Sequence, residues 1–316
     1  MLIHDSFYFC RNGTINMKTI RPEDISTGEL HQILLGSIGP RPIAFASTMD
    51  GDGNPNLSPF SFFNVFSANP PTLVFSPARR VRNNTTKHTL ENCEETREVV
   101  INVVNYDIVE QMSLSSTEYD RGVNEFVKAG LTPLESENVK PFRVAESPVQ
   151  YECIVKDIVS LGDEGGAGNL IICEVVKVHI QEKYLTEEGK IDQRKIDLVG
   201  RMGGNFYSRA HGEALFEVAK PLRNKGIGVD QIPPRIRESY ILSGNDLGKL
   251  GNVEKLPTEA EVEAYSHERD ARDILERAND GYELRELIHT RAKELLEDNH
   301  VMEAWKMLLI DKINRG

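Results

Sequence analysis

The feature that most constrains the fold is a series of short β-rich segments, separated by turn-forming residues, that extends from Ile38 to about Ile180. Val, Ile, Phe and Tyr dominate these segments, and no long helical pattern separates them, as it would in a βαβ protein. The pattern predicts an antiparallel barrel or sandwich. The predicted strands are Ile43–Ser47, Thr72–Ser76, Val99–Val104, Val149–Val159 and Leu170–Ile180.

The segments between these strands have other compositions. Met49–Asn54 (MDGDGN) carries hairpin-turn residues. Thr85–Cys93 and Asp107–Ser115 contain few strand formers, and their apolar spacing predicts two short helices. Gly162–Gly168 (GDEGGAG) is followed by a strand rather than a helix, which predicts a flexible hairpin tip and not a GxGxxG phosphate loop.

The composition changes after Gly251, where Glu, Ala, Leu, Arg and Lys become frequent. Thr258 with Glu261 forms a capping box, and Asp280-Gly281 and Asp298-Asn299 interrupt the apolar stripes, which predicts two or three helices. The stripes are typical of a packing face. Docking on the barrel, covering of a groove and binding of a partner all remain open for this tail. We therefore expect a disordered leader at residues 1–17, a barrel domain at 18–250 and a helical extension at 251–316.

Composition and the absence of certain motifs argue against several classes of function. A formal net charge of −12 over 316 residues disfavours binding to nucleic acid or to an anionic membrane surface. No stretch is long and apolar enough to span a bilayer, and no metal-ligand motif or GxSxG elbow occurs. We expect a soluble cytoplasmic protein without a metal, in which the cysteines are reduced thiols: Cys10, Cys93, Cys153 and Cys173.

Four motifs in one order carry a family resemblance. They are RPIAFAST from Arg41, NLSPFSFFNVFSANPPTLVFS from Asn56, NNTTKHT from Asn83 and GRMGGNFYSR from Gly200. Together they resemble the flavin reductase-like family over Ser37 to Tyr207, although His88 stands where relatives commonly have Asp. The resemblance implies a mainly β, antiparallel Greek-key FMN-binding split β-barrel with short helices, to which this chain adds its α-helical extension. It also implies a homodimer with FMN at the subunit boundary.

The residue types suit the parts of FMN. Lys87 and Thr89 lie at a predicted helix start, where free N–H groups and the helix dipole favour an anion. By resemblance this is the phosphate site, with Arg79, Arg80 and Arg82 as further candidates unless they form a solvated basic turn. Ser47 and Thr48 end the first strand, where they bind ribityl or phosphate oxygens or close a local turn.

The resemblance places the flavin ring near the second motif. Ser58, Phe60, Ser61 and Asn64 fall on or beside one predicted strand, and Ser76 ends the next. Arg201 and Tyr207 lie near the flavin or the dimer contact; alternatively Tyr207 packs an interface and Arg201 pairs with a carboxylate. The expected cofactor-binding set is Arg41, Ser47, Thr48, Ser58, Phe60, Ser61, Asn64, Ser76, Arg80, Lys87, Thr89, Arg201 and Tyr207.

Three functions follow from this reading. The first is an NAD(P)H:flavin oxidoreductase, using NADH or NADPH and serving a separate monooxygenase. The second is an FMN-binding electron-transfer protein without nicotinamide activity that hands electrons to a protein partner. The third is a barrel without flavin. Because the cofactor carries the chemistry, no catalytic side chain is assigned.

Overall fold

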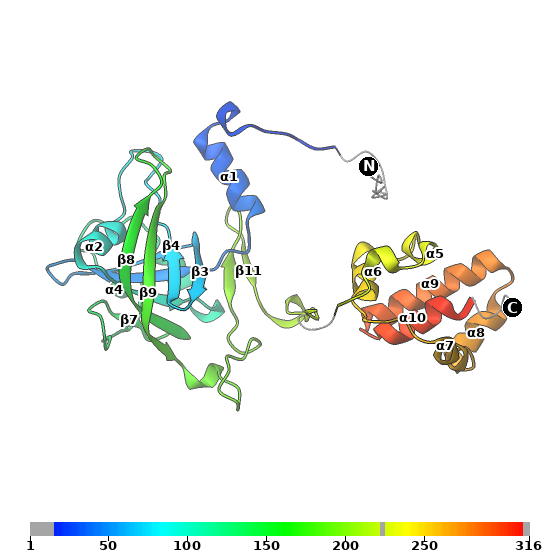
Figure 1. Cartoon of the computed structure of the whole chain (residues 1–316). Helices are drawn as coiled ribbons and strands as arrows, with labels where there is room; N and C mark the ends of the chain where they lie inside the picture. Colours follow the sequence, from blue (N-terminus) through cyan, green and yellow to red (C-terminus); the bar gives the residue numbers. More distant parts are fainter. Residues whose placement is uncertain (1–15, 222–224, 312–316) are drawn as a thin grey trace. The chain divides into compact units, whose positions relative to one another are not determined.

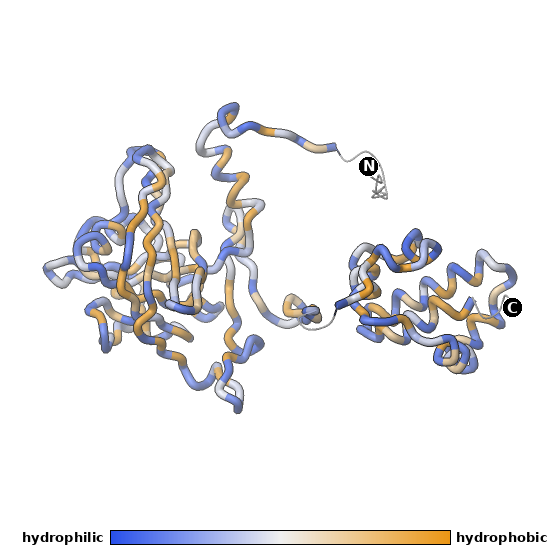
Figure 2. Tube along the Cα trace, in the orientation of Figure 1, coloured by the Kyte–Doolittle hydropathy of each residue, from blue (hydrophilic) through white to orange (hydrophobic). Residues whose placement is uncertain are grey.

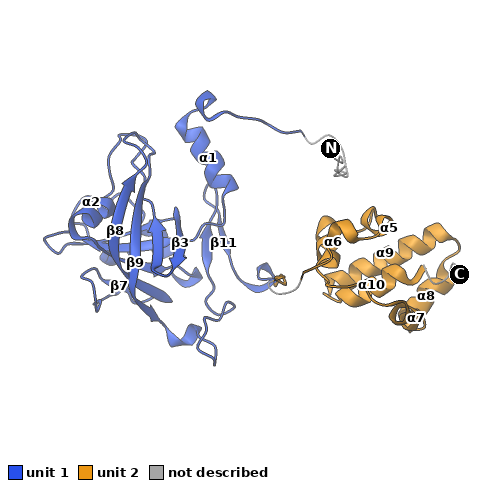
Figure 3. Cartoon of the chain, in the orientation of Figure 1, with its two compact units in different colours: residues 1–216 blue, residues 217–316 orange. Residues whose placement is uncertain are grey.

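The computed structural model describes residues 16–221 and 225–311, which form two compact units, residues 1–216 and 217–316 (Figure 3). The expected boundary near residue 250 differs from this division. Ile232, Ile236, Leu242 and Leu250 are buried in the core of the second unit, so the segment before residue 250 belongs to the helices. Most of the expected leader, residues 1–15, lies outside the described residues.

Unit 1 is built on a seven-stranded antiparallel sheet (Figure 1). All five strands predicted from composition are present. Their bounds differ from the predicted ones by no more than a few residues, because the β-rich runs coincide with the hydrogen-bonded strands of the sheet. In spatial order the strands are β2 (Pro55–Phe60), β1 (Ala44–Met49), β5 (Glu98–Val103), β8 (Val149–Ser160), β9 (Asn169–Ile180), β4 (Pro71–Phe75) and β3 (Phe63–Ala68).

Barrel closure depends on the chain between β2 and β3. These two strands are consecutive in sequence but lie at opposite ends of the sheet order, and only Ser61 and Phe62 separate them. The prediction of one strand from Ser58 to Asn64 was therefore wrong. The segment SPFSFFN carries no Gly or other strong turn signal at the bend, so its composition resembles one continuous strand.

Short helices pack on this sheet. The first predicted helix is α2 (His88–Thr96), which packs with Leu90 and Cys93 on a core formed by β1, β4, β5, β8 and β9. The second is a 3₁₀ turn η2 (Tyr106–Ile108) followed by α3 (Val109–Leu114). With α4 (Glu125–Ala129), α3 covers a second core that contains Phe45 and Phe126.

Helix α1 (Thr27–Ser37) was not predicted. It starts at Ser26 with a capping box to Glu29 and has no buried residue. Figure 2 shows apolar positions along this helix. Ile33 and Leu34 on it are each more than 40% exposed. Its C-terminal end lies beside the hairpin of β10 (Val199–Arg201) and β11 (Tyr207–Arg209), where Gly36 and Gly203 are in contact.

Smaller elements complete unit 1. β6 (Pro133–Leu134) pairs with β7 (Arg143–Val144), and three further 3₁₀ turns are η1 (Pro22–Asp24), η3 (Glu182–Tyr184) and η4 (Gly212–Ala214).

Unit 2 is a bundle around one apolar core, with Trp305 fully buried at its centre. Its described elements are η5 (Val229–Gln231), α5 (Pro234–Arg237), α6 (Gly244–Gly251), α7 (Glu259–Ser266), α8 (Arg269–Arg277), α9 (Gly281–Glu297) and α10 (Val301–Leu309). The predicted capping box at Thr258 and the breaks at Asp280 and Asp298 bound these helices. The predicted number was too low, because α7 and α8 are separate. No helix in the described parts of the chain has the length and apolarity to cross a membrane.

Candidate functional site

Three cations predicted at or near the phosphate site meet at one carboxylate. We call Arg80, Arg82 and Lys87 the cation cluster. Glu118, from the loop between α3 and α4, accepts from Arg80 Nε at 3.1 Å and lies 3.5 Å from Lys87 Nζ through Oε1. Its Oε2 contacts the Arg82 guanidinium. Two segments distant in sequence thus form one charged site.

The cluster lies at the start of α2. Lys87 is the N-cap residue of this helix, has extended backbone angles and makes no side-chain cap hydrogen bond. A lysine cannot accept a hydrogen bond from the first helical N–H groups, so these groups and the helix dipole face an uncapped end. An uncapped helix start beside three cations is suited to an anion.

The charges at this site shift the titration of both partners. Burial lowers the pKa of Lys87, Arg80 lowers it further, and Glu118 only partly opposes the shift. The pKa of Glu118 is lowered: burial raises it, but the hydrogen bond from Arg80 and the charges of Lys87 and Arg82 outweigh burial. The excess of positive charge follows from the contacts themselves, in which three cations meet one carboxylate.

The Gly-rich hairpin tip between β8 and β9 supports this cation loop. Gly166 N–H donates to Arg79 O at 3.0 Å, and Arg79 N–H donates to Ala167 O at 2.8 Å. A Cβ at Gly165 would lie only 3.0 Å from Val81 O. The predicted position of the tip between two paired strands is confirmed, whereas its predicted flexibility stays a prediction. The glycines of the tip allow close backbone approach to the loop that carries the cations.

Two candidates in this loop bind their own neighbours. Arg79 Nε donates to Asn84 Oδ1 at 2.6 Å, so its guanidinium is held by its own turn. Arg80 Nη1 also donates to Thr85 Oγ1 at 2.9 Å and to the Thr86 carbonyl. These bonds fix the direction of Arg80 toward Glu118.

The predicted ring-binding residues lie around the bend between β2 and β3. Ser76 N–H donates to Phe62 O at 2.8 Å, which joins the end of β4 to this bend. The Phe60 ring packs on Phe75 at 5.5 Å, and Ser58 is half-buried on β2. Asn64 is exposed on β3, where its Oδ1 accepts from the Val65 N–H at 2.8 Å.

Helix α1 reaches the same bend. The His31 ring lies edge-on to the Phe62 ring at 6.1 Å. The bend, the end of β4 and one side of α1 therefore adjoin. Ser76 and Arg80 are four residues apart along one connection, so the ring candidates and the cation cluster lie on one continuous segment.

Arg41 is buried, and its guanidinium is almost fully engaged. Its Nη1 donates to Leu35 O at 2.8 Å and Ile38 O at 2.5 Å, its Nη2 to Met202 O at 2.9 Å, and its Nε approaches Ser61 Oγ at 3.4 Å. Burial and the nearby Arg201 lower its pKa. The structure therefore shows Arg41 joining the end of α1 to the β10 segment.

Thr48 and Thr89 belong to a buried polar network that sequence reasoning missed. Asn92 Nδ2 donates to Thr48 Oγ1 at 3.1 Å, and Thr89 Oγ1 donates to Asn56 Oδ1 at 2.8 Å. Asn56 Nδ2 in turn donates to Glu125 Oε1 at 3.0 Å. Burial raises the pKa of Glu125, and hydrogen bonds from Leu57 N–H and Asn56 only partly offset this.

Nothing in the sequence links Asn56 to Glu125, because the two lie on different elements and meet only in the folded barrel. Ser47 is also fully buried, and its Oγ has no hydrogen-bond partner within the described residues.

Arg201 and Tyr207 contact each other. The Arg201 guanidinium lies 4.7 Å from the Tyr207 ring centroid, and its Nη1 donates to Phe206 O at 3.0 Å. The alternative prediction that Arg201 pairs with a carboxylate was wrong for the part of the chain that the structure describes. Arg209 instead pairs with Asp197, at 2.6 Å between Nη2 and Oδ2.

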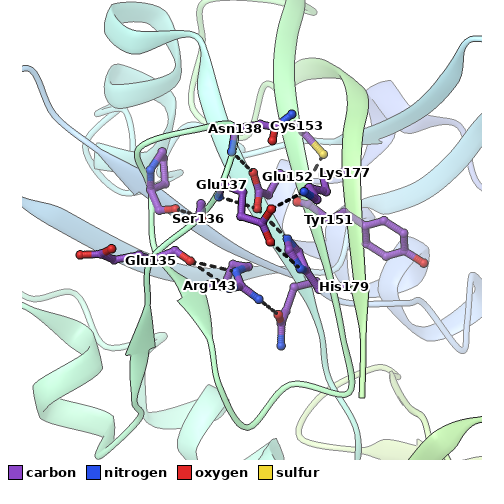
Figure 4. A network of polar contacts seen from close by, with 12 residues as sticks. Glu135, Ser136, Glu137, Asn138, Arg143, Tyr151, Glu152, Cys153, Lys177 and His179 are labelled. Atoms are coloured by element: carbon purple, nitrogen blue, oxygen red, sulfur yellow. Dashed lines mark hydrogen bonds and ion pairs between the residues drawn. The ribbon is translucent and has the colours of Figure 1, made fainter. Parts of the chain in front are cut away.

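A third polar network, on β8 and β9, serves the fold (Figure 4). The buried carboxylate of Glu152 accepts from Glu137 N–H at 2.9 Å, from Asn138 N–H at 2.6 Å and from His179 Nε2 at 2.7 Å. Lys177 contacts Glu137 in the same group. The network attaches the segment before β7 to the sheet and includes no predicted cofactor residue.

Two hollows in the described part of unit 1 do not include the ring candidates. One, with a cavity volume of about 20 Å³, is lined by Asp50, Asn54, Pro55, Asn56, His88, Asn92, Arg121, Gly122, Val123 and Glu125. A second, of about 190 Å³, is lined by Met49–Gly53, Thr96, Glu98 and Lys140. Small-molecule pockets are usually ~300–1,000 Å³ and largely apolar, so both hollows are smaller than such pockets. Among the described residues no group of His, Cys, Asp and Glu side chains is arranged to hold a metal ion.

Comparisons with known proteins bear on the family and the fold of this chain. The model of the flavin reductase like domain matches residues 36–195. An uncharacterized protein of Aquifex aeolicus is 38% identical over 189 residues, which cover 60% of this chain and 94% of that protein. The residues matched by the family model lie within unit 1.

Two solved structures share the fold. Nitrilotriacetate monooxygenase component B from Bacillus cereus is similar with a TM-score of 0.60 and 30% identity, over 65% of this chain and all of that one. A protein with a split barrel domain from Shewanella frigidimarina gives a TM-score of 0.53 and 28% identity, over 63% of this chain and 95% of that one. About a third of this chain lies outside each of these two matches.

Proposed function

Because this chain belongs to the flavin reductase-like family, we propose that it binds FMN and accepts hydride from NADH or NADPH as an oxidoreductase. The observation that supports the FMN assignment is the cation cluster at the uncapped start of α2. Its donors fit the dianionic phosphate of FMN. Bound FMN would supply the hydride acceptor, and the chain would hold and orient it.

The site residues divide by role in this proposal. Arg80, Arg82 and Lys87 hold the phosphate. Ser61, Phe62 and Ser76 adjoin the ring through backbone groups near the β2–β3 bend. The buried hydroxyls of Thr48 and Thr89 take part in hydrogen bonds that join α2 to β1 and β2.

We further propose that a second copy of this chain completes the flavin site. Val65 and Phe66 on β3 are 64% and 68% exposed, and α1 exposes Ile33 and Leu34. Exposed apolar side chains gathered near one bend are typical of an interaction surface. The His31–Phe62 contact joins α1 to that bend, so the apolar surface adjoins the ring candidates.

The primary test is FMN binding by the full chain, followed by anaerobic titration with each nicotinamide at flavin wavelengths. Bleaching supports the oxidoreductase. FMN binding without bleaching supports the electron-transfer alternative, in which a separate redox partner, such as a monooxygenase, exchanges electrons with the flavin. A colourless protein that shows no heat of FMN binding would contradict both proposals.

Lys87→Gln tests the phosphate assignment. We expect it to weaken FMN binding about tenfold, because a charge-assisted contact is lost. Lys190→Gln, an equal charge change at an exposed turn, should leave the affinity unchanged. Equal effects of the two variants would show that only net charge matters.

Phe66→Glu tests the second copy. It places a charge on the exposed face of β3, so we expect monomers in light scattering and weaker FMN binding. A monomeric wild-type chain that binds FMN tightly would contradict the shared site.

A further inference from the structure

The cation cluster already contacts an anion that belongs to the chain. Glu118 divides its two carboxylate oxygens between the three cations, with Oε1 toward Arg80 and Lys87 and Oε2 toward Arg82. Three positive groups face one negative group, which leaves two positive charges in excess. A carboxylate in this position has the donors that a phosphate oxygen would use.

Neighbouring charged groups do not change this balance. Two further carboxylates lie near the start of α2. Glu125 accepts from Asn56 Nδ2, while Glu91 Oε2 binds Arg121 at 2.9 Å and Glu91 Oε1 accepts from Thr86 Oγ1 at 2.6 Å. Arg79 binds Asn84. Glu118 is thus the acid that contacts the cation cluster among the described residues.

The position of Glu118 allows it to leave the cluster. It lies in the loop between α3 and α4, in residues 115–124, and its side chain is 37% exposed. Arg80 is more buried, with 16% of its side chain exposed, and is held by Thr85 and Thr86 as well. Arg80 is therefore fixed by its own loop, whereas the carboxylate reaches it from another segment. Among the described residues, the side-chain contact of both Arg82 and Lys87 is with Glu118.

We propose that Glu118 is an internal competitor for the phosphate position and that a phosphomonoester binds by displacing it. A phosphomonoester carries about −1.5 to −2 charges and three acceptor oxygens, so it satisfies the cluster better than one carboxylate. Because the phosphate group must displace Glu118, the cation cluster binds this group less tightly than it would without the competing carboxylate. For the proposed FMN ligand, on which this inference rests, Glu118 then makes the flavin exchangeable rather than permanently held.

The test compares the full-length wild type with Glu118→Gln in calorimetry at low ionic strength, with FMN, riboflavin and inorganic phosphate as ligands. We expect Glu118→Gln to bind FMN and phosphate about tenfold more tightly, because a competing charge is removed. Riboflavin has no phosphate, so its affinity should stay within about twofold. FMN dissociation in stopped flow should slow by the same factor as the affinity rises.

Two variants serve as controls. Glu94→Gln removes an equal charge from an exposed position on α2 and should leave all three affinities unchanged. Glu118→Asp keeps the charge with a shorter reach, and should tighten FMN binding less than Glu118→Gln does.

Unchanged or weaker FMN and phosphate binding by Glu118→Gln would overturn the proposal, since weaker binding would mean that Glu118 orders the cations for the ligand. An equal gain for riboflavin, or no phosphate binding by either protein, would overturn it too. If phosphate binding tightens but no flavin binds, the competitor role stands and the FMN function fails. If FMN binds wild type and Glu118→Gln equally, the function stands and the competitor role fails.

Discussion

The two units of this chain are stabilised by different means. Unit 1 buries charged and polar side chains in networks that cross between elements, such as those of Glu125 and Glu152. In the described part of unit 2 the buried polar side chains are Ser239, Asp246 and His289, and its core is otherwise apolar. A barrel fixed by polar networks can present polar groups at precise positions, which a cofactor site requires.

Unit 2 depends mainly on apolar burial and on helix caps. Capping boxes at Ser243 and Thr258 and the Asp280 cap begin three of its helices. Such caps are local in sequence, and each contributes about 1 kcal/mol. The comparison indicates that the two units respond to different perturbations.

The largest expected effect is that of Trp305→Ala. Trp305 is fully buried and donates to Leu250 O at 3.0 Å, so its removal leaves a cavity and an unpaired carbonyl. We expect a loss of about 4 kcal/mol from unit 2 alone. Circular dichroism should show an earlier helical transition while FMN affinity stays unchanged. A parallel loss of flavin binding would show that the units are not energetically independent.

Glu152→Ala tests the barrel in the same way. It would leave the Glu137 and Asn138 N–H groups and His179 without their acceptor, at a cost of about 3 kcal/mol to unit 1. Trp305 is the one tryptophan of the chain, so its fluorescence reports unit 2, which should remain folded. Glu174→Ala removes a carboxylate on the adjacent strand that pairs with Lys156 near the surface, and should cost far less.

Lowering the pH should change the contributions of two buried carboxylates to the stability of unit 1 in opposite directions. Burial raises the pKa of Glu152. The hydrogen bonds from Glu137 N–H, His179 and Asn138 N–H lower this pKa by more than burial raises it, so the net pKa lies below its ordinary value of 4.5. Its contribution is therefore complete above about pH 4.5 and is lost as the pH falls through the folded value.

Glu125 has the opposite sign, because burial raises its pKa. It favours folding below its ordinary value of 4.5, and this contribution is lost as the pH rises through the folded value. The test is chemical denaturation of each variant between pH 3 and 7. In Glu152→Gln the free energy of unfolding should fall less steeply as the pH is lowered, and Glu125→Gln should stabilise the barrel near pH 7. Identical pH profiles for both variants would contradict these assignments.

The smallest effect is expected for Thr258→Ala. It removes the capping box with Glu261 at the start of α7 and should cost unit 2 about 1 kcal/mol. The transition followed by Trp305 fluorescence should move to a lower temperature. Thr186→Ala, in an exposed turn of unit 1, should leave that transition unchanged.

The sequence alone determined the features that depend on near neighbours. The β-rich runs identified β1, β4, β5, β8 and β9, and turn and cap residues located the β8–β9 tip and the start of α7. The order of four motifs indicated the family that the comparisons confirm. These signals consist of local composition and of the order of motifs along the chain, and both can be recognised in the sequence without the fold.

Only the tertiary structure decided how distant segments meet. The β2–β3 bend closes the barrel at Ser61 and Phe62, a place where composition shows no turn. Glu118 reaches the cation cluster, Asn56 reaches Glu125, and residues before 250 join the helical core. These contacts form because burial and charge pairing act across space, between residues whose separation in the chain carries no information about their distance in the fold.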